Sequence, residues 1–220
     1  RAARMSGEVV TRIVAGRARG RRVKIPSAGT RPTSDRLREA LFASVESRLR
    51  AVGRGWQDVA VADLWAGSGA VGLEAWSRGA ARVLLVEKNP AAVSVMMGNV
   101  SSLDADGEVE CRRADVGLVV TSEPPGGPFD VIFADPPYAY DDASLSGDLG
   151  SAVRSGWCAP DALVIVERAS KRGRSTGERS SQGRTEPDSQ DMLALPPEIK
   201  IVDHRVYGDS ALWYGRVSGP

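Results

Sequence analysis

The sequence predicts an α/β fold in which a largely parallel sheet carries helices on both of its faces. Two observations lead to this prediction. From residue 59 onward, short apolar segments alternate with helical ones, and repeated βα units of this kind build parallel sheets. A glycine-rich turn also follows the first of these apolar segments, at the place where open α/β sheets bind their ligands.

The strands of the sheet are predicted by five short apolar segments, at residues 59–63, 82–87, 109–112, 130–134 and 162–167. Helices are expected between them, at 70–78, 90–103, 115–122 and 143–156. Two later strands, 199–206 and 211–215, are joined by a turn at 207–210. This terminal hairpin would add an antiparallel strand to the parallel sheet.

The N-terminal part of the chain predicts a separate β-hairpin. Residues 8–14 and 21–25 have the composition of short strands, and a basic, glycine-rich stretch at 16–20 lies between them. A lone hairpin is marginally stable in water, so we expect this one to pack on the main domain or on a partner.

An amphipathic helix follows a linker at 26–32. Thr33 or Ser34 can cap this helix, and its apolar stripe recurs every fourth position, at Leu37, Leu41, Val45 and Leu49. We therefore divide the chain into an extension with its linker, 1–32, and a main domain, 33–220. Residues 168–191 are rich in Ser, Arg, Gly and Gln and predict a flexible insertion within that domain.

Charge is distributed unevenly along the chain, although the net charge is only +1. Residues 1–54 hold fourteen basic and four acidic side chains, whereas the remainder holds 15 basic and 24 acidic ones. A basic arm on an acidic body is typical of nucleic-acid binding, because clustered Arg and Lys displace phosphate counterions. The alternative is a solvated basic tail.

Several classes of protein are disfavoured by composition. No stretch approaches the roughly 20 apolar residues of a membrane span, and the first residues lack the apolar core of a signal peptide. Cys111, Cys158 and the single His204 form no metal-binding pattern. We expect a cytoplasmic protein with no metal and no membrane contact.

The glycine loop after the first strand of the main domain predicts a cofactor site. Gly67, Gly69 and Gly72 match the pattern GxGxxG, which alone is weak evidence and also fits a tight turn. Asp63 ends the strand before these glycines. A dinucleotide would place its pyrophosphate at this turn, whereas S-adenosylmethionine carries a cationic sulfonium and ammonium, which suit a carboxylate there.

Two further acids follow the next two strands. Glu87 ends the second strand and can accept hydrogen bonds from both ribose hydroxyls, of NAD and of S-adenosylmethionine alike. Asp115 follows the third strand and can accept a hydrogen bond from an adenine amine. Its other interpretation is a helix N-cap, and the two roles are compatible.

A candidate catalytic loop, Asp135-Pro136-Pro137-Tyr138, follows the fourth strand. The two prolines end the strand and stiffen the turn. The lone pair of an aromatic amine is delocalised into its ring, so the amine needs two acceptors that grip its N–H bonds and orient it. The Asp135 carboxylate and the Pro136 carbonyl suit this task, and the Tyr138 ring can stack on an extruded base. The alternative is a simple turn.

This combination resembles the class I methyltransferases whose (Asp/Asn)-Pro-Pro-aromatic motif acts on exocyclic amines. Further blocks are similar to the bacterial 16S ribosomal RNA guanine-N2 methyltransferases, the RsmD-type family. These blocks are 11–13 with Gly16, 20–22, 30–42, 63–72, 74–80 and 206–208. The similarity covers nearly the whole chain outside 168–191. Trp65 departs from the Phe, Tyr or Cys that such loops often carry.

The resemblance implies a Rossmann-like fold, with a seven-stranded sheet that contains one antiparallel strand. It implies methyl transfer to a guanine N2 of 16S rRNA, presented in an assembling 30S particle, by a monomeric enzyme. Its cofactor site would comprise Asp63, Ala66, Gly67, Ser68, Gly69, Glu87, Lys88, Asp115 and Asp135. Its RNA contacts would be Arg17, Arg19, Arg21, Arg22, Arg31, Thr33, Arg36 and Arg38. The alternative for Arg31, Arg36 and Arg38 is that they are solvated helix charges or form ion pairs with Glu39 and the acidic body.

Three other functions are weighed against this one. A DNA amino-methyltransferase would use the same motif on adenine N6 or cytosine N4, but the chain shows no separate target-recognition domain. An NAD-dependent oxidoreductase would need a hydride-transfer site and a substrate domain. A non-catalytic RNA-binding assembly factor fits the hairpin and the charge distribution equally well. Cytosine C5 methylation is disfavoured, because neither cysteine lies in a catalytic loop.

Overall fold

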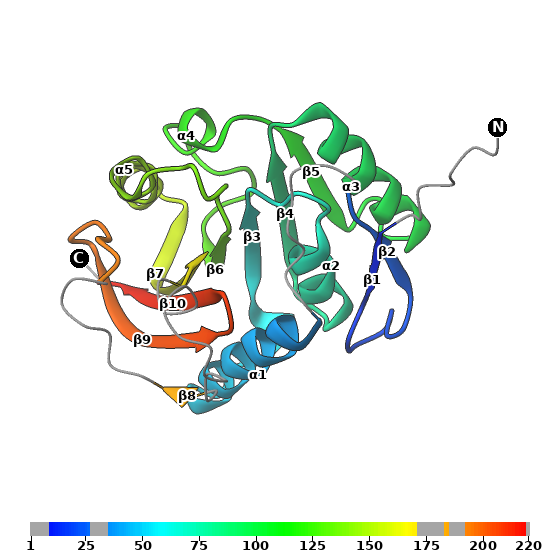
Figure 1. The fold of residues 1–220 in the computed structure, drawn as a ribbon, viewed down its shortest axis with the longest axis horizontal. Helices are drawn as coiled ribbons and strands as arrows, with labels where there is room; N and C mark the ends of the chain where they lie inside the picture. The colour runs from blue at the N-terminus through cyan, green and yellow to red at the C-terminus, as the bar shows by residue number, and fades with distance from the viewer. Residues whose placement is uncertain (1–8, 27–34, 171–182, 185–191, 219–220) are drawn as a thin grey trace.

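The computed structural model describes residues 9–26, 35–170, 183–184 and 192–218. Its main feature is one mixed sheet with the strand order β5-β4-β3-β6-β7-β10-β9-β8 (Figure 1). Five strands run parallel: β3 (Ala60–Leu64), β4 (Arg82–Glu87), β5 (Val109–Arg113), β6 (Phe129–Ala134) and β7 (Cys158–Ala169). Strand β10 (Ser210–Val217) is antiparallel to both β7 and β9 (Ile199–Tyr207).

The predicted seven-stranded sheet with one antiparallel strand is confirmed in these seven strands. Two details differ from the prediction for residues 168–191. Arg168 and Ala169 belong to β7, because they pair with Ala211 and Ser210 on β10. The two-residue strand β8 (Gly183–Arg184) pairs antiparallel with β9 as an eighth strand. Residues 171–182 and 185–191 lie outside the described part, as does the predicted linker from residue 27 to 32.

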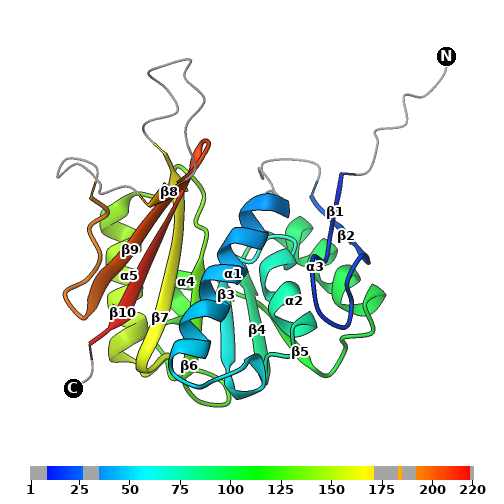
Figure 2. The same cartoon turned by 90° about the horizontal axis from the view of Figure 1, so that it is seen from below.

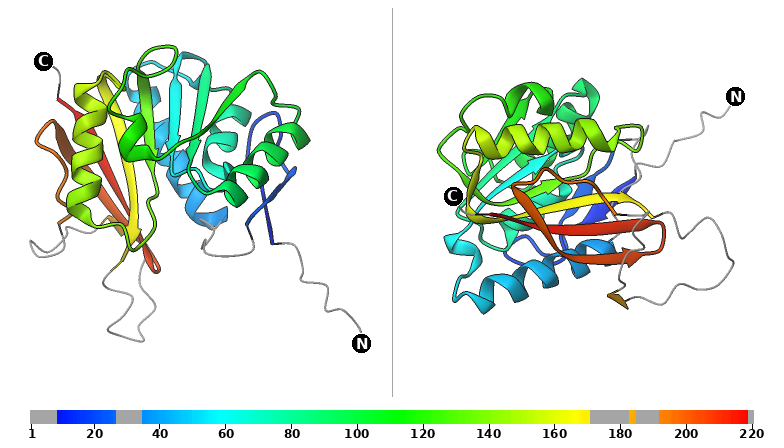
Figure 3. Two further views of the ribbon diagram at one scale, coloured as in Figure 1. Left: turned by 90° about the horizontal axis from the view of Figure 1, so that it is seen from above. Right: turned by 90° about the vertical axis from the view of Figure 1, so that its left-hand side faces the viewer.

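Helices cover both faces of the sheet, as predicted. On one face pack α1 (Asp35–Ala51), α2 (Ala70–Ser77) and α3 (Pro90–Ser102), and on the other α4 (Val116–Val119) and α5 (Asp142–Arg154). The right panel of Figure 3 shows α5 and α1 on opposite sides of the strands. A 3₁₀ helix, Trp56–Asp58, leads from α1 into β3.

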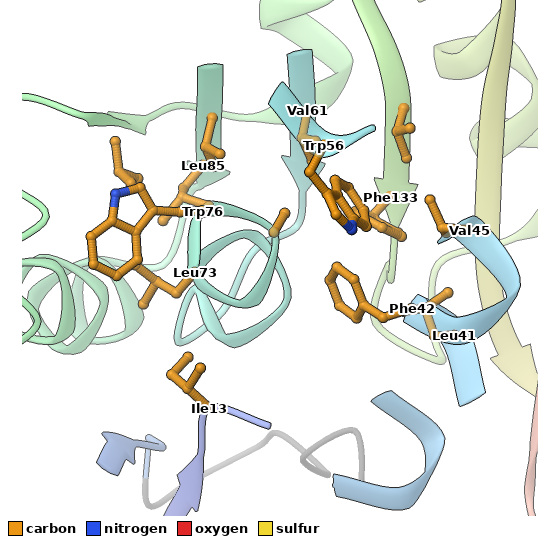
Figure 4. Close-up of a cluster of buried hydrophobic side chains, with 14 of the residues drawn as sticks. Ile13, Leu41, Phe42, Val45, Trp56, Val61, Leu73, Trp76, Leu85 and Phe133 are labelled. Atoms are coloured by element: carbon orange, nitrogen blue, oxygen red, sulfur yellow. The ribbon is translucent and has the colours of Figure 1, made fainter. Parts of the chain in front are cut away.

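The core consists of two clusters, one on each face of the sheet. Side chains of a strand point alternately to its two faces, so neighbouring residues enter different clusters. On the α1 face, Phe42 lies with its ring centroid 5.5 Å from that of Trp56 and 5.7 Å from that of Phe133 (Figure 4). The predicted stripe of α1 is buried here at all four positions: Leu37, Leu41, Val45 and Leu49. Helix α1 is therefore held by apolar packing.

The N-terminal hairpin packs on the main domain. Its strands β1 (Val10–Arg12) and β2 (Arg22–Lys24) pair antiparallel, and Figure 2 shows them beside α2 and α3. The fully buried carboxylate of Glu74 on α2 accepts hydrogen bonds from the Val14 N–H (2.7 Å) and the Ala15 N–H (3.0 Å). Gly16 approaches α2 so closely that a Cβ there would lie 1.9 Å from the Ser77 carbonyl oxygen.

Glu74 should be a major determinant of stability. Replacing it with Ala leaves two backbone N–H groups without their acceptor and removes one partner of Arg78, whose Nε donates at 2.8 Å. We expect Glu74→Ala to lower the free energy of unfolding by about 3 kcal/mol in denaturant titrations. The exposed Glu110→Ala should change it by less than about 0.5 kcal/mol. Equal effects of the two variants would contradict this account of the hairpin's attachment.

Candidate active site

Four carboxylates lie on one face of the sheet at the carboxyl ends of neighbouring strands. The residues two positions before them are Val61, Leu85, Phe133 and Ile165, which all belong to the cluster on the α1 face. Because side chains alternate along a strand and the four strands are parallel, the carboxylates share that face and that edge. We call this set the acidic edge: Asp63 on β3, Glu87 on β4, Asp135 directly after β6 and Glu167 on β7.

Asp63 is the buried member of the acidic edge. It is 3% exposed, and its Oδ2 accepts a hydrogen bond from the Gly72 N–H at 2.8 Å. Burial, with the nearby charge of Glu87, raises the pKa of Asp63 to about 7, although the Gly72 hydrogen bond acts in the opposite direction. A Cβ at Gly72 would lie 2.2 Å from Leu85 Cδ2, so any larger residue there would displace this fully buried side chain. The match to GxGxxG therefore has a packing cause at this position.

The loop from β3 to α2 has an unusual backbone. Gly67 and Gly69 adopt positive φ angles of 55° and 78°, and Trp65 does so at 62°. Left-handed backbone is rare for a bulky residue and is often found at functional sites. The Tyr140 ring makes an edge contact with Trp65 at 5.5 Å between centroids. Trp65, which stands where similar loops often carry Phe, Tyr or Cys, is thus also a position of backbone strain, which the sequence alone did not reveal.

Glu87 binds this loop from the next strand. Its Oε2 accepts a hydrogen bond from the Gly67 N–H at 2.9 Å, and its Oε1 accepts one from the Asn89 N–H at 2.7 Å. The glycine loop is therefore held beside the carboxylate that we predict to bind the ribose. That binding role itself stays a prediction.

A buried asparagine that the sequence analysis did not select connects the loop to the hairpin. Asn99 on α3 is 1% exposed, and its Nδ2 donates to the carbonyl oxygens of Ser68 and Lys24, each at 2.9 Å. Its Oδ1 accepts from the Lys24 N–H at 2.9 Å. The signal in the sequence that could have identified Asn99 is its position three residues after Met96, which puts a polar side chain on the inner face of an amphipathic helix.

The loop after β6 is held at both ends. The Asp135 N–H donates to the Leu64 carbonyl at 3.4 Å, and the Tyr140 N–H to the Pro137 carbonyl at 2.7 Å. Arg168 then fixes the far end, since it donates to the Tyr140 carbonyl at 2.7 Å and pairs with Asp142 at 2.8 Å.

Within this loop Pro136 is buried, whereas the Tyr138 ring is 53% exposed. Part of the Asp135 surface reaches solvent, yet protein atoms crowd its carboxyl group. This desolvation, together with the charges of Glu167 and Asp63, raises the pKa of Asp135 well above its usual range, and Arg168 offsets only part of the shift. The loop thus combines a rigidly held carboxyl group, whose pKa is raised, with an accessible aromatic ring.

Lys88 and Asp115 form an ion pair beside the glycine loop, with 3.0 Å between Nζ and Oδ2. Asp115 also caps α4, because its Oδ1 accepts a hydrogen bond from the Gly117 N–H at 3.0 Å. The N-cap interpretation is confirmed, and the contact with an adenine amine stays a prediction.

One predicted RNA contact is wrong. The Arg38 side chain is 1% exposed, and its Nη2 donates to Thr11, to the Arg12 carbonyl and to Asp35 at 2.7–2.8 Å. Arg38 therefore joins α1 to the hairpin and cannot reach RNA in this conformation. The ion-pair alternative describes it better, although Asp35, and not Glu39, is the partner.

The other predicted arginines differ in what they contact. Arg17 pairs with Glu108 at 2.6 Å and lies 4.0 Å above the Trp76 ring, and Arg21 pairs with Asp104 at 2.9 Å. Both are about half exposed. Arg19, Arg22 and Arg36 are exposed, and Arg31 and Thr33 lie outside the described residues.

Other kinds of site are absent from the part of the chain that the structure describes. None of its helices is long and apolar enough to cross a membrane. It also contains no group of three or more His, Cys, Asp or Glu side chains that could hold a metal ion.

The strand order, the glycine loop after β3 and the acidic loop after β6 define a class I methyltransferase. A family model described as "Conserved hypothetical protein 95" matches residues 11–216, and the chain belongs to this family. It is 34% identical over 172 residues to the Ribosomal RNA small subunit methyltransferase D of Escherichia coli, covering 78% of this chain and 81% of that protein. The predicted membership of the RsmD-type family is thereby confirmed.

Solved structures agree with this placement. The structure titled "Putative methyltransferase yhhF from Escherichia coli" matches with a TM-score of 0.73 and 28% identity, covering 96% of this chain and all of that one. The magnesium protoporphyrin IX methyltransferase of Synechocystis, solved with bound S-adenosylmethionine, shares the fold at 16% identity. Its TM-score is 0.54, over 82% of this chain and 79% of that one.

The raised pKa of Asp63 predicts a characteristic dependence of stability on pH. An acid whose pKa is higher in the folded state binds more protons when folded, so stability falls as pH rises from about 4 to about 7 and is then constant. Asp63→Asn removes this effect. In denaturant titrations, the free energy of unfolding of the variant should rise relative to that of the wild type as the pH increases across that window, by on the order of 4 kcal/mol.

A stability difference between Asp63→Asn and the wild type that stays flat with pH would contradict the raised pKa of Asp63.

Proposed function

We propose that this methyltransferase transfers a methyl group from S-adenosylmethionine to the exocyclic N2 amine of a guanine in 16S rRNA. The observation that carries the proposal is the position of Asp135 and Tyr138, which follow β6 next to the glycine loop that follows β3. The name of the Escherichia coli relative supports a ribosomal RNA of the small subunit as the substrate.

The residues at the glycine loop fit S-adenosylmethionine. Glu87 and, when it is ionised, Asp63 offer negative charge to a ligand whose sulfonium and ammonium are positive. A Cβ added at Gly67 would meet no atom within 4 Å. We propose that the cofactor is held by Asp63, Ala66, Gly67, Ser68, Gly69, Glu87, Lys88, Asp115 and Asp135. The bound cofactor supplies an electrophilic methyl group whose leaving group is a neutral thioether.

The loop after β6 would bind and orient the amine. The Asp135 carboxylate and the Pro136 carbonyl accept its two N–H bonds, Pro137 keeps the turn rigid, and Tyr138 stacks on the flipped base. Orientation of the nitrogen lone pair is the main contribution, since the neutral leaving group needs no acid. The Asp135 carboxylate, which holds the amine, is also placed to accept the proton that the methylated amine releases.

The RNA surface that we propose starts at the tip of the hairpin. Arg19 is exposed there, Arg22 is exposed at the start of β2, and Arg36 is exposed at the start of α1. Arg17 and Arg21 form ion pairs that hold the hairpin in place, so only the exposed part of each side chain would contact RNA. We further propose a cytoplasmic monomer that acts on an assembling 30S particle.

The three alternative functions are not equally compatible with these findings. An oxidoreductase is set aside, since the relative and the structural neighbours are named methyltransferases. A DNA amino-methyltransferase would use the same loop, and an assembly factor would use the same hairpin, so both are outcomes of the test below.

The test uses tritiated S-adenosylmethionine with small subunits, naked 16S rRNA and duplex DNA from a strain that lacks this activity, followed by nucleoside analysis. We expect label as N2-methylguanosine in rRNA. Asp135→Ala should lose at least about 100-fold in kcat, because positioning of the amine is lost. Cofactor affinity should fall much less, because the other eight residues of the proposed cofactor site remain. The exposed Glu110→Ala is the matched control. Label in DNA bases, or no label in any substrate, would refute the proposal.

The hairpin predicts a change in the salt dependence of RNA binding. Each phosphate contact that is removed should reduce the slope of log K against log salt by about 1. We expect Arg19→Ala with Arg22→Ala to weaken 16S rRNA binding and to flatten this slope by about 2, as measured by filter binding. Arg154→Ala, on α5 across the sheet, should leave both unchanged. A slope equal to that of the wild type would remove the hairpin tip from the interface.

A further inference from the structure

Glu167 is the member of the acidic edge that the proposed function leaves unused. Strands β6 and β7 are parallel, with Ala134 opposite Val166. One residue further on, Asp135 therefore lies beside Glu167, and both side chains point to the α1 face by strand alternation. The separation of paired positions on neighbouring strands is about 5 Å. Glu167 thus stands next to the carboxylate that would hold the amine.

Glu167 is also fixed in place. It is half-buried, and its Oε1 accepts a hydrogen bond from the Ser210 Oγ on β10 at 2.8 Å. The next residue, Arg168, holds the loop after β6 through the Tyr140 carbonyl and Asp142. Strand β7 consequently sets the position of Glu167 and of the Asp135 loop together. The influence of Glu167 on the pKa of Asp135 agrees with this proximity.

The Watson–Crick edge of guanine differs from those of the other two candidate bases. In guanine the exocyclic N2 amine is a donor, and the adjacent ring nitrogen N1 carries a hydrogen and is also a donor. In adenine and cytosine the exocyclic amine is a donor, but the adjacent ring nitrogen is an acceptor. An ionised carboxylate only accepts hydrogen bonds, so Asp135 and Glu167 match two adjacent donors when both are ionised. Two N–H donors favour that ionised form, which burial and mutual repulsion oppose.

We propose that Glu167 accepts a hydrogen bond from guanine N1–H while Asp135 holds the N2 amine, and that Glu167 thereby selects guanine. The inference rests on the proposed function and adds a specificity-determining residue to it. With adenine or cytosine, the Glu167 carboxylate would face a ring nitrogen lone pair, which leaves two acceptors together in a desolvated site. Sites built to bind a substrate N–H discriminate strongly against analogues that lack it.

The experiment uses the guanine that the wild-type enzyme methylates in 16S rRNA. In rebuilt rRNA this guanine is replaced by 2-aminopurine, which keeps the 2-amine but has an unprotonated N1. The wild type should prefer guanine in kcat/KM by between about tenfold and a hundredfold, the range for one hydrogen bond to a charged group. In Glu167→Gln, the amide can donate to the N1 of 2-aminopurine. The preference should therefore vanish or reverse, while cofactor affinity and melting temperature stay near the wild type.

Glu110→Gln, an exposed position on β5, should keep the wild-type preference. If Glu167→Gln keeps that preference, or slows both substrates equally, Glu167 only shapes the surroundings of Asp135 and the inference is overturned. If the wild type methylates no guanine in rRNA, the proposed function fails instead. The two failures are therefore distinguished by the wild-type reaction alone.

Discussion

The accumulation of like charge at one edge of the sheet is the constraint on which the rest of the site depends. Parallel strands bring their carboxyl ends together, and alternation puts the four carboxylates of the acidic edge on one face. Each charge makes its neighbour harder to ionise, which contributes to the raised pKa values of Asp63 and Asp135. A cationic ligand at the glycine loop would relieve this repulsion. The same charges that destabilise the ligand-free site would therefore contribute to binding.

The hairpin and the glycine loop are parts of one buried polar network, although the hairpin precedes the main domain in the chain. Glu74 holds the hairpin on α2, which begins at the glycine loop, and Asn99 bonds both Lys24 and Ser68. Arg38 connects the hairpin with α1 in the same way. An arm attached at three helices keeps a fixed position relative to the catalytic loop.

Local patterns explain why so much of the fold and site could be predicted from the sequence. Strand alternation, the glycine spacing and the two prolines act within a few residues, and the structure places Asp63, Glu87 and Asp135 where those patterns indicate. Arg38 was misassigned because its acceptors, Thr11 and the Arg12 carbonyl, come from a distant segment. Asn99 was missed for the same reason. Both are buried polar residues whose partners are set by tertiary structure, and no periodicity encodes such a pairing.

Selection among the exocyclic amines cannot come from the Asp135 loop alone, since an acceptor pair around one amine fits guanine, adenine and cytosine equally. The difference between these bases begins at the adjacent ring nitrogen, and the group that meets it must lie beside Asp135. In a parallel sheet the position beside the end of β6 belongs to β7, whose register is fixed along its length by pairing with β6 and β10. The loop after β6 thus binds the exocyclic amine, and the adjacent strand β7 determines which base carries that amine.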